Sequence, residues 1–173
     1  MMANEDKYKL LSNIYIYDSF SKVSSYNAIV NDTKETQEFD YNVFHLKGES
    51  QSLMYNNAIV NSDSYIILNT DGIIKKGAIG TDLNQKSKGI LLDEKSNIIA
   101  NPILEIDEYD CKASHGAGVG AIDESDLFYL MSRGIQKDAA TKLIIHGYLD
   151  PVLKEIEDTN VVEYIKNIVN EKI

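Results

Sequence analysis

The thiol and one of the imidazoles of the chain occur together in the segment CKASHGAGVG (111–120). Cys111 is the only cysteine, and His115 is one of three histidines. Thiolate and imidazole groups suit iron or zinc. If the segment is a strand, Cys111, Ala113 and His115 share one face, with roughly 13 Å between the first and the last. That is too far for the two side chains to bind one ion unless the strand bends or a second chain takes part. Two ligands also make an incomplete site, so the residue types alone do not favour metal binding.

The remaining residues that could do chemistry have ordinary explanations. His45 lies in the strand-like run VFHL and His146 in an apolar helical run, so we interpret both as packed side chains. The glycines of 116–123 lack the order and the Lys-Ser/Thr of phosphate-binding loops. A carbohydrate-active β-helix enzyme, with Glu105 and Asp107 as acid and base, has no supporting motif. We expect that the protein is not an enzyme.

Composition excludes several classes of partner. The chain has 173 residues and a formal net charge of -10, and Arg133 is its only arginine, which disfavours nucleic-acid binding. No run approaches the ~18 apolar residues of a membrane span, and the first residues do not resemble a secretory signal. With a single cysteine there is no internal disulfide. These features predict a soluble, cytoplasmic protein with no membrane partner.

The chain divides into two parts, 1–121 and 122–173. In the first part, short apolar runs rich in β-branched residues predict strands: 13–20, 26–32, 42–48, 56–82 and 88–107. Their return every ~8–12 residues is typical of a sandwich, a barrel or a parallel solenoid. Paired apolar residues close to Ala or Gly favour the stacked rungs of a β-helix. The segment NTDG (69–72) predicts a tight turn.

The second part is predicted to be helical. Asp123 is the expected N-cap of a first helix, which Gly134 ends. A second helix is expected over about 137–148 and a last one over about 160–172, with Asp150-Pro151 restarting the chain between them. We expect these helices to cover the protein's own core, although packing against another protein is an alternative.

The segment ILLDEKSNIIANPILEIDEYDCKASHGAGVGAIDESDLFYLMSRGI (90–135) closely resembles the signature of the SufB/SufD family of iron–sulfur cluster assembly proteins. The upstream GTDLNQKSKGILL (80–92) is similar to a further stretch of that family. The resemblance implies a mainly β fold, a right-handed parallel β-helix core over 1–121 followed by a small C-terminal helical region. It also implies a SufD-like component of the SUF iron–sulfur cluster assembly machinery.

The resemblance carries over to particular residues. His115 matches the family's SHG histidine, which is implicated in cluster formation at the SufB–SufD interface, and Gly116 follows it as in SufD. Ser87 aligns with the key SufB cysteine, and Ala113 with the common SufD cysteine. Cys111 lies close enough in the sequence to take the place of that SufD cysteine. His115 and Cys111 are thus the implied candidates for a transient iron–sulfur cluster shared with a partner, and no other cofactor is expected.

The resemblance also implies partners. A SufC-type ABC ATPase is expected to dock on the helices around SRGI, and the candidate docking residues are Leu127, Phe128, Tyr129, Arg133, Lys137 and Lys142. Lys137 and Lys142 are expected to be exposed, so charge reversal at either should weaken that complex without lowering thermal stability. A SufB-like subunit or a second copy, forming a dimer, would cover the open β-helix edge. The alternative is a β-helix binding or structural module that has lost cluster-assembly activity.

Overall fold

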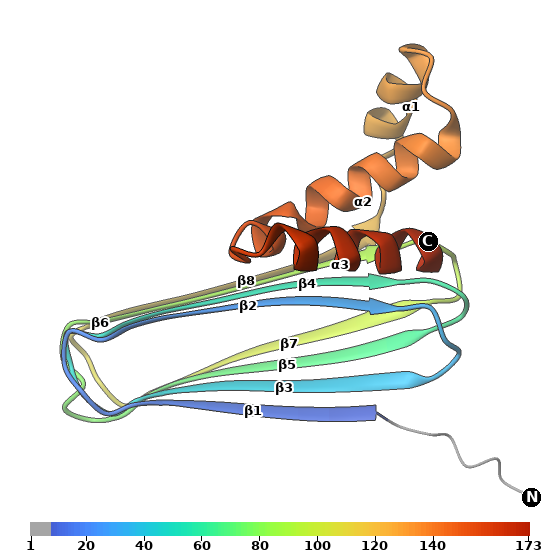
Figure 1. The fold of residues 1–173 in the computed structure, drawn as a ribbon. Helices are drawn as coiled ribbons and strands as arrows, with labels where there is room; N and C mark the ends of the chain where they lie inside the picture. Colours follow the sequence, from blue (N-terminus) through green and yellow to red (C-terminus); the bar gives the residue numbers. More distant parts are fainter. Residues whose placement is uncertain (1–7) are drawn as a thin grey trace, which may run out of the picture.

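A computed structural model of the protein describes residues 8–173 and shows a solenoid of strands followed by three helices (Figure 1). The strands are β1 (Tyr8–Ile16), β2 (Lys22–Asn31), β3 (Thr36–His45), β4 (Gln51–Val60), β5 (Tyr65–Ile74), β6 (Thr81–Leu91), β7 (Asn97–Ile106) and β8 (Cys111–Ala121). The helices are α1 (Glu124–Ser132), α2 (Lys137–Leu153) and α3 (Thr159–Lys172).

The strands form two parallel sheets that face each other across the core. Sheet A has the order β1-β3-β5-β7 and sheet B the order β2-β4-β6-β8. Each strand therefore lies beside the one that follows a full turn later, about 30 residues further along the chain. A sandwich or closed barrel would pair its strands differently, so this pairing confirms the predicted parallel β-helix.

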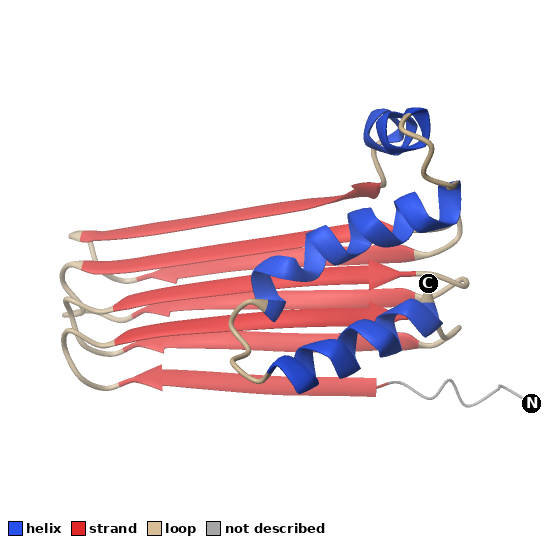
Figure 2. Cartoon of the chain, turned by 45° about the horizontal axis from the view of Figure 1, so that its top comes forward, coloured by secondary structure: helices blue, strands red, loops and turns tan. Residues whose placement is uncertain are grey.

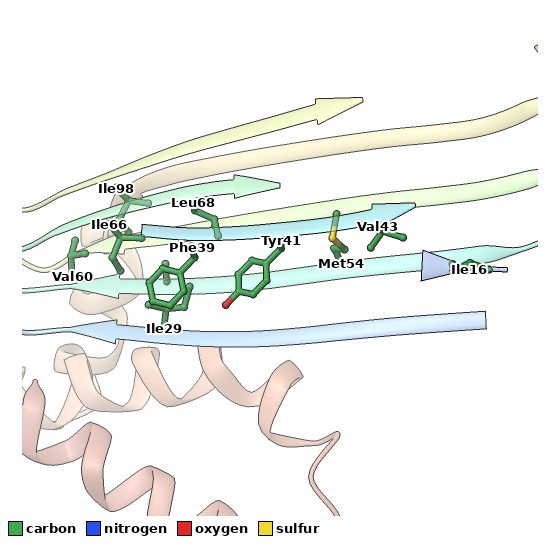
Figure 3. Packing of buried hydrophobic residues seen from close by; sticks show 11 residues of the cluster. Ile16, Ile29, Phe39, Tyr41, Val43, Met54, Val60, Ile66, Leu68 and Ile98 are labelled. Atoms are coloured by element: carbon green, nitrogen blue, oxygen red, sulfur yellow. The ribbon is translucent and has the colours of Figure 1, made fainter. Parts of the chain in front are cut away.

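The core of the solenoid lies between the two sheets (Figure 3). Alternate side chains point inward, as the two-residue period of a strand requires, and Val43, Met54, Ile66 and Leu68 are almost completely buried. Apolar side chains at inward positions stack on those of the next rung, so the core is continuous from rung to rung.

The turn predicted at NTDG (69–72) is wrong, because these residues lie inside β5. Asp71 points outward from the sheet, and Gly72 occupies a crowded inward position. A Cβ atom at Gly72 would lie 2.7 Å from the methyl groups of Leu83 and 2.8 Å from Nε2 of Gln85. The glycine therefore provides space for packing across the core rather than a positive φ angle.

Helices α2 and α3 cover the outer face of sheet B, whereas α1 projects away from it (Figures 1 and 2). Ile59 and Ile90 of the sheet pack with Ile145 and Leu149 of α2 and with Val169 of α3. The helices thus share an apolar cluster with the solenoid. Among the described residues, no helix is both long and apolar enough to cross a membrane.

The ends of the helices follow the predicted caps with one exception. The Asp123 side chain accepts a hydrogen bond from the backbone N–H of Ser125 at the start of α1, and Gly134 has a φ angle of 88° after its end. The expected restart at Asp150-Pro151 is wrong, since α2 continues through Pro151 to Leu153. The final turn is held by burial of Val152 and Leu153, which outweighs the backbone hydrogen bond that proline cannot make.

Candidate functional site

Strand β8 is the last strand of sheet B and pairs on one side only, with β6, within the described part of the chain. Thr81, Leu83 and Gln85 of β6 are buried, inward-facing residues, and they are in register with Cys111, Ala113 and His115 respectively. The last three residues therefore share the inward face of β8, as predicted. Because no further rung covers this end in the described structure, His115 is exposed and the other two are half-buried.

Cys111 is held in its thiol form. Its Sγ–H donates to the backbone carbonyl of Glu108 at 3.3 Å. Burial raises the pKa of the Cys111 thiol, and the carboxylates of Glu108 and Asp110 raise it further. Since the thiolate is the nucleophile and the metal ligand, this environment disfavours cluster binding by Cys111 alone. Residues 8–173 contain no group of three or more His, Cys, Asp or Glu side chains that could hold a metal ion.

The register places other residues around His115. Ser87, which the resemblance aligns with the SufB cysteine, is buried, accepts a hydrogen bond from Nδ2 of Asn56 at 3.2 Å, and is in register with Ala117. It therefore lies one inward position further along β6 than the residue beside His115. That neighbour is Gln85, so Ser87 and His115 lie on adjacent strands but do not face each other directly.

Gln85 is the residue of this site that the sequence patterns do not identify. It is 1% exposed, and its Nε2 donates to the carbonyl of Ile103 at 3.3 Å. Its Oε1 is buried with no hydrogen-bond partner among the described residues. The signal that would have found it is the length of the rung. Once a turn is known to take about 30 residues, Gln85 is the strand neighbour of His115.

The candidate docking residues of α1 lie on an exposed helix. None of the α1 residues is buried by the described part of the chain, and Phe128 and Tyr129 are 73% and 57% exposed. The Arg133 guanidinium lies over the Tyr129 ring, 5.3 Å from its centroid. Leu127 and Lys137 line one groove between the helices and the solenoid. These five residues thus occupy neighbouring positions on the projecting end of the helical region.

Lys142 differs from this group. It is half-buried, and its Nζ donates to the backbone carbonyl of Asn170 in α3 at 2.9 Å. A cation at that position also suits the C-terminal end of a helix. The assumption that Lys142 is free on the surface is therefore wrong, and reversing its charge would disturb the packing of α2 on α3.

The two other histidines are packed, as predicted. His146 donates through Nε2 to Oδ1 of Asn170 at 2.7 Å. His45 is fully buried, with its two ring nitrogens 2.7 Å from the hydroxyls of Ser50 and Ser52. Burial lowers the pKa of His45 to about 4, so its ring is neutral near pH 7. Both rings are structural members of the fold and lie apart from the open strand β8.

Comparison with known proteins places this geometry in a family. Residues 4–148 match the model of the SufBD core domain of the SUF system for FeS cluster assembly. The chain is 34% identical over 145 residues to the iron–sulfur cluster assembly protein SufD of Bacillus subtilis, covering 84% of this chain and 33% of that protein. It is 32% identical over 114 residues to SufD of Escherichia coli, covering 66% of this chain and 27% of that protein.

A SufBD family protein of Pyrococcus horikoshii is 35% identical over 131 residues, which cover 72% of this chain and 28% of that protein. The chain thus spans about a third of the length of these relatives. The match also begins at residue 4, so it includes the first rungs as well as the motif-bearing rungs. The match covers most of the chain, and the chain belongs to the SufBD core-domain family.

Proposed function

We propose that this chain is a non-catalytic, SufD-like component of iron–sulfur cluster assembly, which supports cluster formation together with a partner scaffold. The observation that carries the proposal is the position of the family's SHG histidine. His115 lies on the inward face of the last strand and is exposed because nothing in the described structure covers that strand. A ligand at an open edge is available to a site that two chains share.

The open edge of β8 supports a second chain as the missing partner. An edge strand presents unpaired backbone N–H and C=O groups that can pair with another strand. The chain offers an imidazole and a protonated thiol at this edge, too few ligands for a cluster. In the proposal, a SufB-like subunit or a second copy pairs along β8 and supplies the remaining ligands, with the cluster as cargo.

Helix α1 supports the second part of the proposal, a docking surface for a SufC-type ABC ATPase. Within the described residues α1 has apolar side chains but no fully buried residue, which is characteristic of an interaction surface. Aromatic and arginine side chains contribute most to protein interfaces, and Phe128, Tyr129 and Arg133 provide both kinds. Lys137 adds an exposed charge at the start of α2. The ATPase would supply all nucleotide chemistry.

The docking proposal is tested by mixing the purified chain with the SufC-like ATPase of the same genome and measuring the mass of the complex by size-exclusion chromatography with light scattering. We expect a stable complex at tens of micromolar, weakened at least tenfold by Phe128→Ala. Phe20→Ala is the matched control, because Phe20 is 79% exposed in the connection between β1 and β2 of the first rung, whereas α1 follows the last rung. No complex with the wild-type chain, or equal weakening by both variants, would contradict docking through α1.

The cluster proposal needs a separate measurement. Anaerobic reconstitution with the SufB-like partner is expected to yield a cluster absorbance that His115→Ala abolishes, while the mass of the protein complex stays unchanged. Formation of the same cluster without His115 would contradict the proposed role of this residue.

A second candidate function is a β-helix binding module that no longer assembles clusters. The absence of a thiol at the two family cysteine positions, Ser87 and Ala113, favours it. Such a module would still bind the ATPase but would give no cluster with any partner. The two experiments together therefore distinguish the candidates.

A further inference from the structure

We propose that Gln85 is a positioning residue for His115. Its side-chain Oε1 accepts the ring N–H of His115, which fixes the tautomer and leaves the other ring nitrogen as a free lone pair facing the open end of the solenoid. The inference deepens the proposed function, because it rests on His115 being the working residue of β8. It concerns an interaction within this chain and requires no partner.

The register brings the two side chains together. Gln85 and His115 are aligned residues of the parallel strands β6 and β8, and neighbouring strands lie about 4.8 Å apart. Both side chains project into the solenoid from the same sheet, because the inward positions of β6 continue in register onto β8. A glutamine is long enough to reach the ring of the next rung.

The orientation of the Gln85 amide is set by its other contacts. Nε2 donates to the carbonyl of Ile103 on β7, so Oε1 is the end of the amide that remains available. The missing side chain of Gly72 makes space for this arrangement, since a Cβ atom there would lie 2.8 Å from Nε2. The result is a buried acceptor without a hydrogen-bond partner among residues 8–173, and native proteins usually pair such groups.

His115 is the inward residue of β8 best suited to supply the missing donor. The inward residues on either side of it are Ala113 and Ala117, which carry no polar group. Cys111 already donates its S–H to the carbonyl of Glu108. The imidazole of His115 is exposed and is aligned with Gln85 in the strand register, so we assign its ring N–H as the donor to Oε1.

The hydrogen bond would determine which ring nitrogen of His115 can bind a ligand. A neutral imidazole carries a hydrogen on one nitrogen and a lone pair on the other. When the N–H is bonded to a fixed acceptor, the lone pair is therefore held on the opposite nitrogen. Ligating histidines in proteins commonly donate their other N–H to a fixed acceptor, which orients the ring and raises its basicity. Gln85 would give His115 this support before any cargo arrives.

The experiment measures the tautomer of His115 in the isolated full chain by NMR of the ring nitrogens after ¹⁵N-histidine labelling, with His115→Ala used to assign the signals. We expect one dominant tautomer in the wild-type protein and a change of at least fivefold in the tautomer ratio in Gln85→Met. Methionine keeps the volume and removes the acceptor. Gln85→Glu, which retains an acceptor, is expected to keep the wild-type tautomer.

The matched control is Asn56→Leu. Asn56 is also a buried amide, but it lies on β4, one rung further from β8, and its hydrogen bonds go to Asn27 and Ser87. We expect Asn56→Leu to lower the thermal stability and to leave the tautomer ratio of His115 unchanged. If Gln85→Met does not fold, Gln85→Asn is used instead. Its side chain is one carbon shorter, so the amide moves away from His115 and the same change in tautomer ratio is expected.

An unchanged tautomer ratio in a folded Gln85→Met or Gln85→Asn chain would overturn the inference. A wild-type ratio equal to that of histidine in a short unstructured peptide would also overturn it. Neither result depends on ATPase binding or cluster formation, so the failure of this inference and the failure of the proposed function remain distinguishable.

Discussion

Two rungs of the same solenoid each contain an inward-facing histidine, but only one of the two is buried. In the second rung His45 is completely buried between the hydroxyls of Ser50 and Ser52. In the last rung His115 faces inward as well, but it is exposed. The side chains are chemically identical and have the same orientation relative to their sheets. An inward position of a solenoid is therefore buried where another rung follows it and exposed where none does.

The same contrast extends beyond the histidines. The complete rungs contain the inward residues that are most deeply buried, and α2 and α3 cover the outer face of their sheet B. β8 and α1 contain no buried residue within the described structure. The first region is therefore expected to determine stability, and the second to determine which partners bind. Substitutions matched between the two regions test this division.

The largest effect is expected for an apolar residue of a complete rung. Leu68 is 1% exposed, and Leu68→Ala should lower the free energy of unfolding by about 2–5 kcal/mol through lost burial and a cavity. Val119→Ala on β8, where Val119 is 40% exposed, should cost less than about 1 kcal/mol. Urea denaturation measures both, and equal losses would show that the last rung is as well packed as the others.

The next effect is a pH dependence that only the buried histidine should produce. Burial lowers the pKa of His45 to about 4, below the ordinary value of about 6.5, so the unfolded chain binds the proton more tightly. The resulting stability is complete above pH 6.5 and is lost as the pH falls towards 4, by up to about 3 kcal/mol. Unfolding measured over this range should show a smaller decline in His45→Gln. If the free energy of unfolding depended on pH equally in the wild-type protein and in His45→Gln, the proposed titration of His45 would be wrong.

A glycine pair gives the third comparison. A Cβ atom at Gly48 would collide with the backbone carbonyl of Ile79 on the next rung, so Gly48→Ala should cost about 1–3 kcal/mol through overpacking. At Gly118 of β8 a Cβ atom would have no neighbour within 4 Å, and Gly118→Ala should be neutral or slightly stabilising. Thermal unfolding checks the pair, and a destabilised Gly118→Ala would indicate that something already covers β8 in solution.

The smallest effect concerns the two lysines of α2. Lys142→Glu removes the hydrogen bond to the Asn170 carbonyl and should cost about 1 kcal/mol of stability. Lys137→Glu, at an exposed position, should leave the melting temperature unchanged and weaken only the ATPase complex. A melting temperature that is unchanged in both variants would contradict the role of Lys142 in holding α2 on α3.

Much of the fold could be predicted from local patterns. Alternating β-branched residues indicated strands, and Asp123 and Gly134 marked the ends of the first helix. The errors arose where packing outweighed a local preference. Asp71-Gly72 has the chemistry of a turn but lies within β5 because the core needs space at the glycine. Pro151 has the chemistry of a helix start but lies within α2 because the residues after it are buried.

The candidate site was only partly predictable. The period of two along a strand was enough to place Cys111 and His115 on one face, because that rule depends on the backbone of a single strand. Gln85 could not be found this way, since its relation to His115 depends on the length of a whole rung. The exposure expected of Lys142 was wrong for a similar reason, because its hydrogen-bond partner Asn170 lies in another helix.

The strand and helix types, the family resemblance and the shared face of β8 were all accessible from the amino-acid sequence, because they follow from local periodicity and from an ordered series of motifs. Which inward residues are buried and which are exposed became clear only from the packing of the rungs. The packing also places the amide of Gln85 beside His115, and it leaves Lys137 exposed while Lys142 bonds to α3. These properties depend on the neighbouring rung or helix, and the number of residues in each turn, 29 between Tyr8 and Gln37 but 32 between Tyr65 and Asn97, is set by corners that no local pattern reveals.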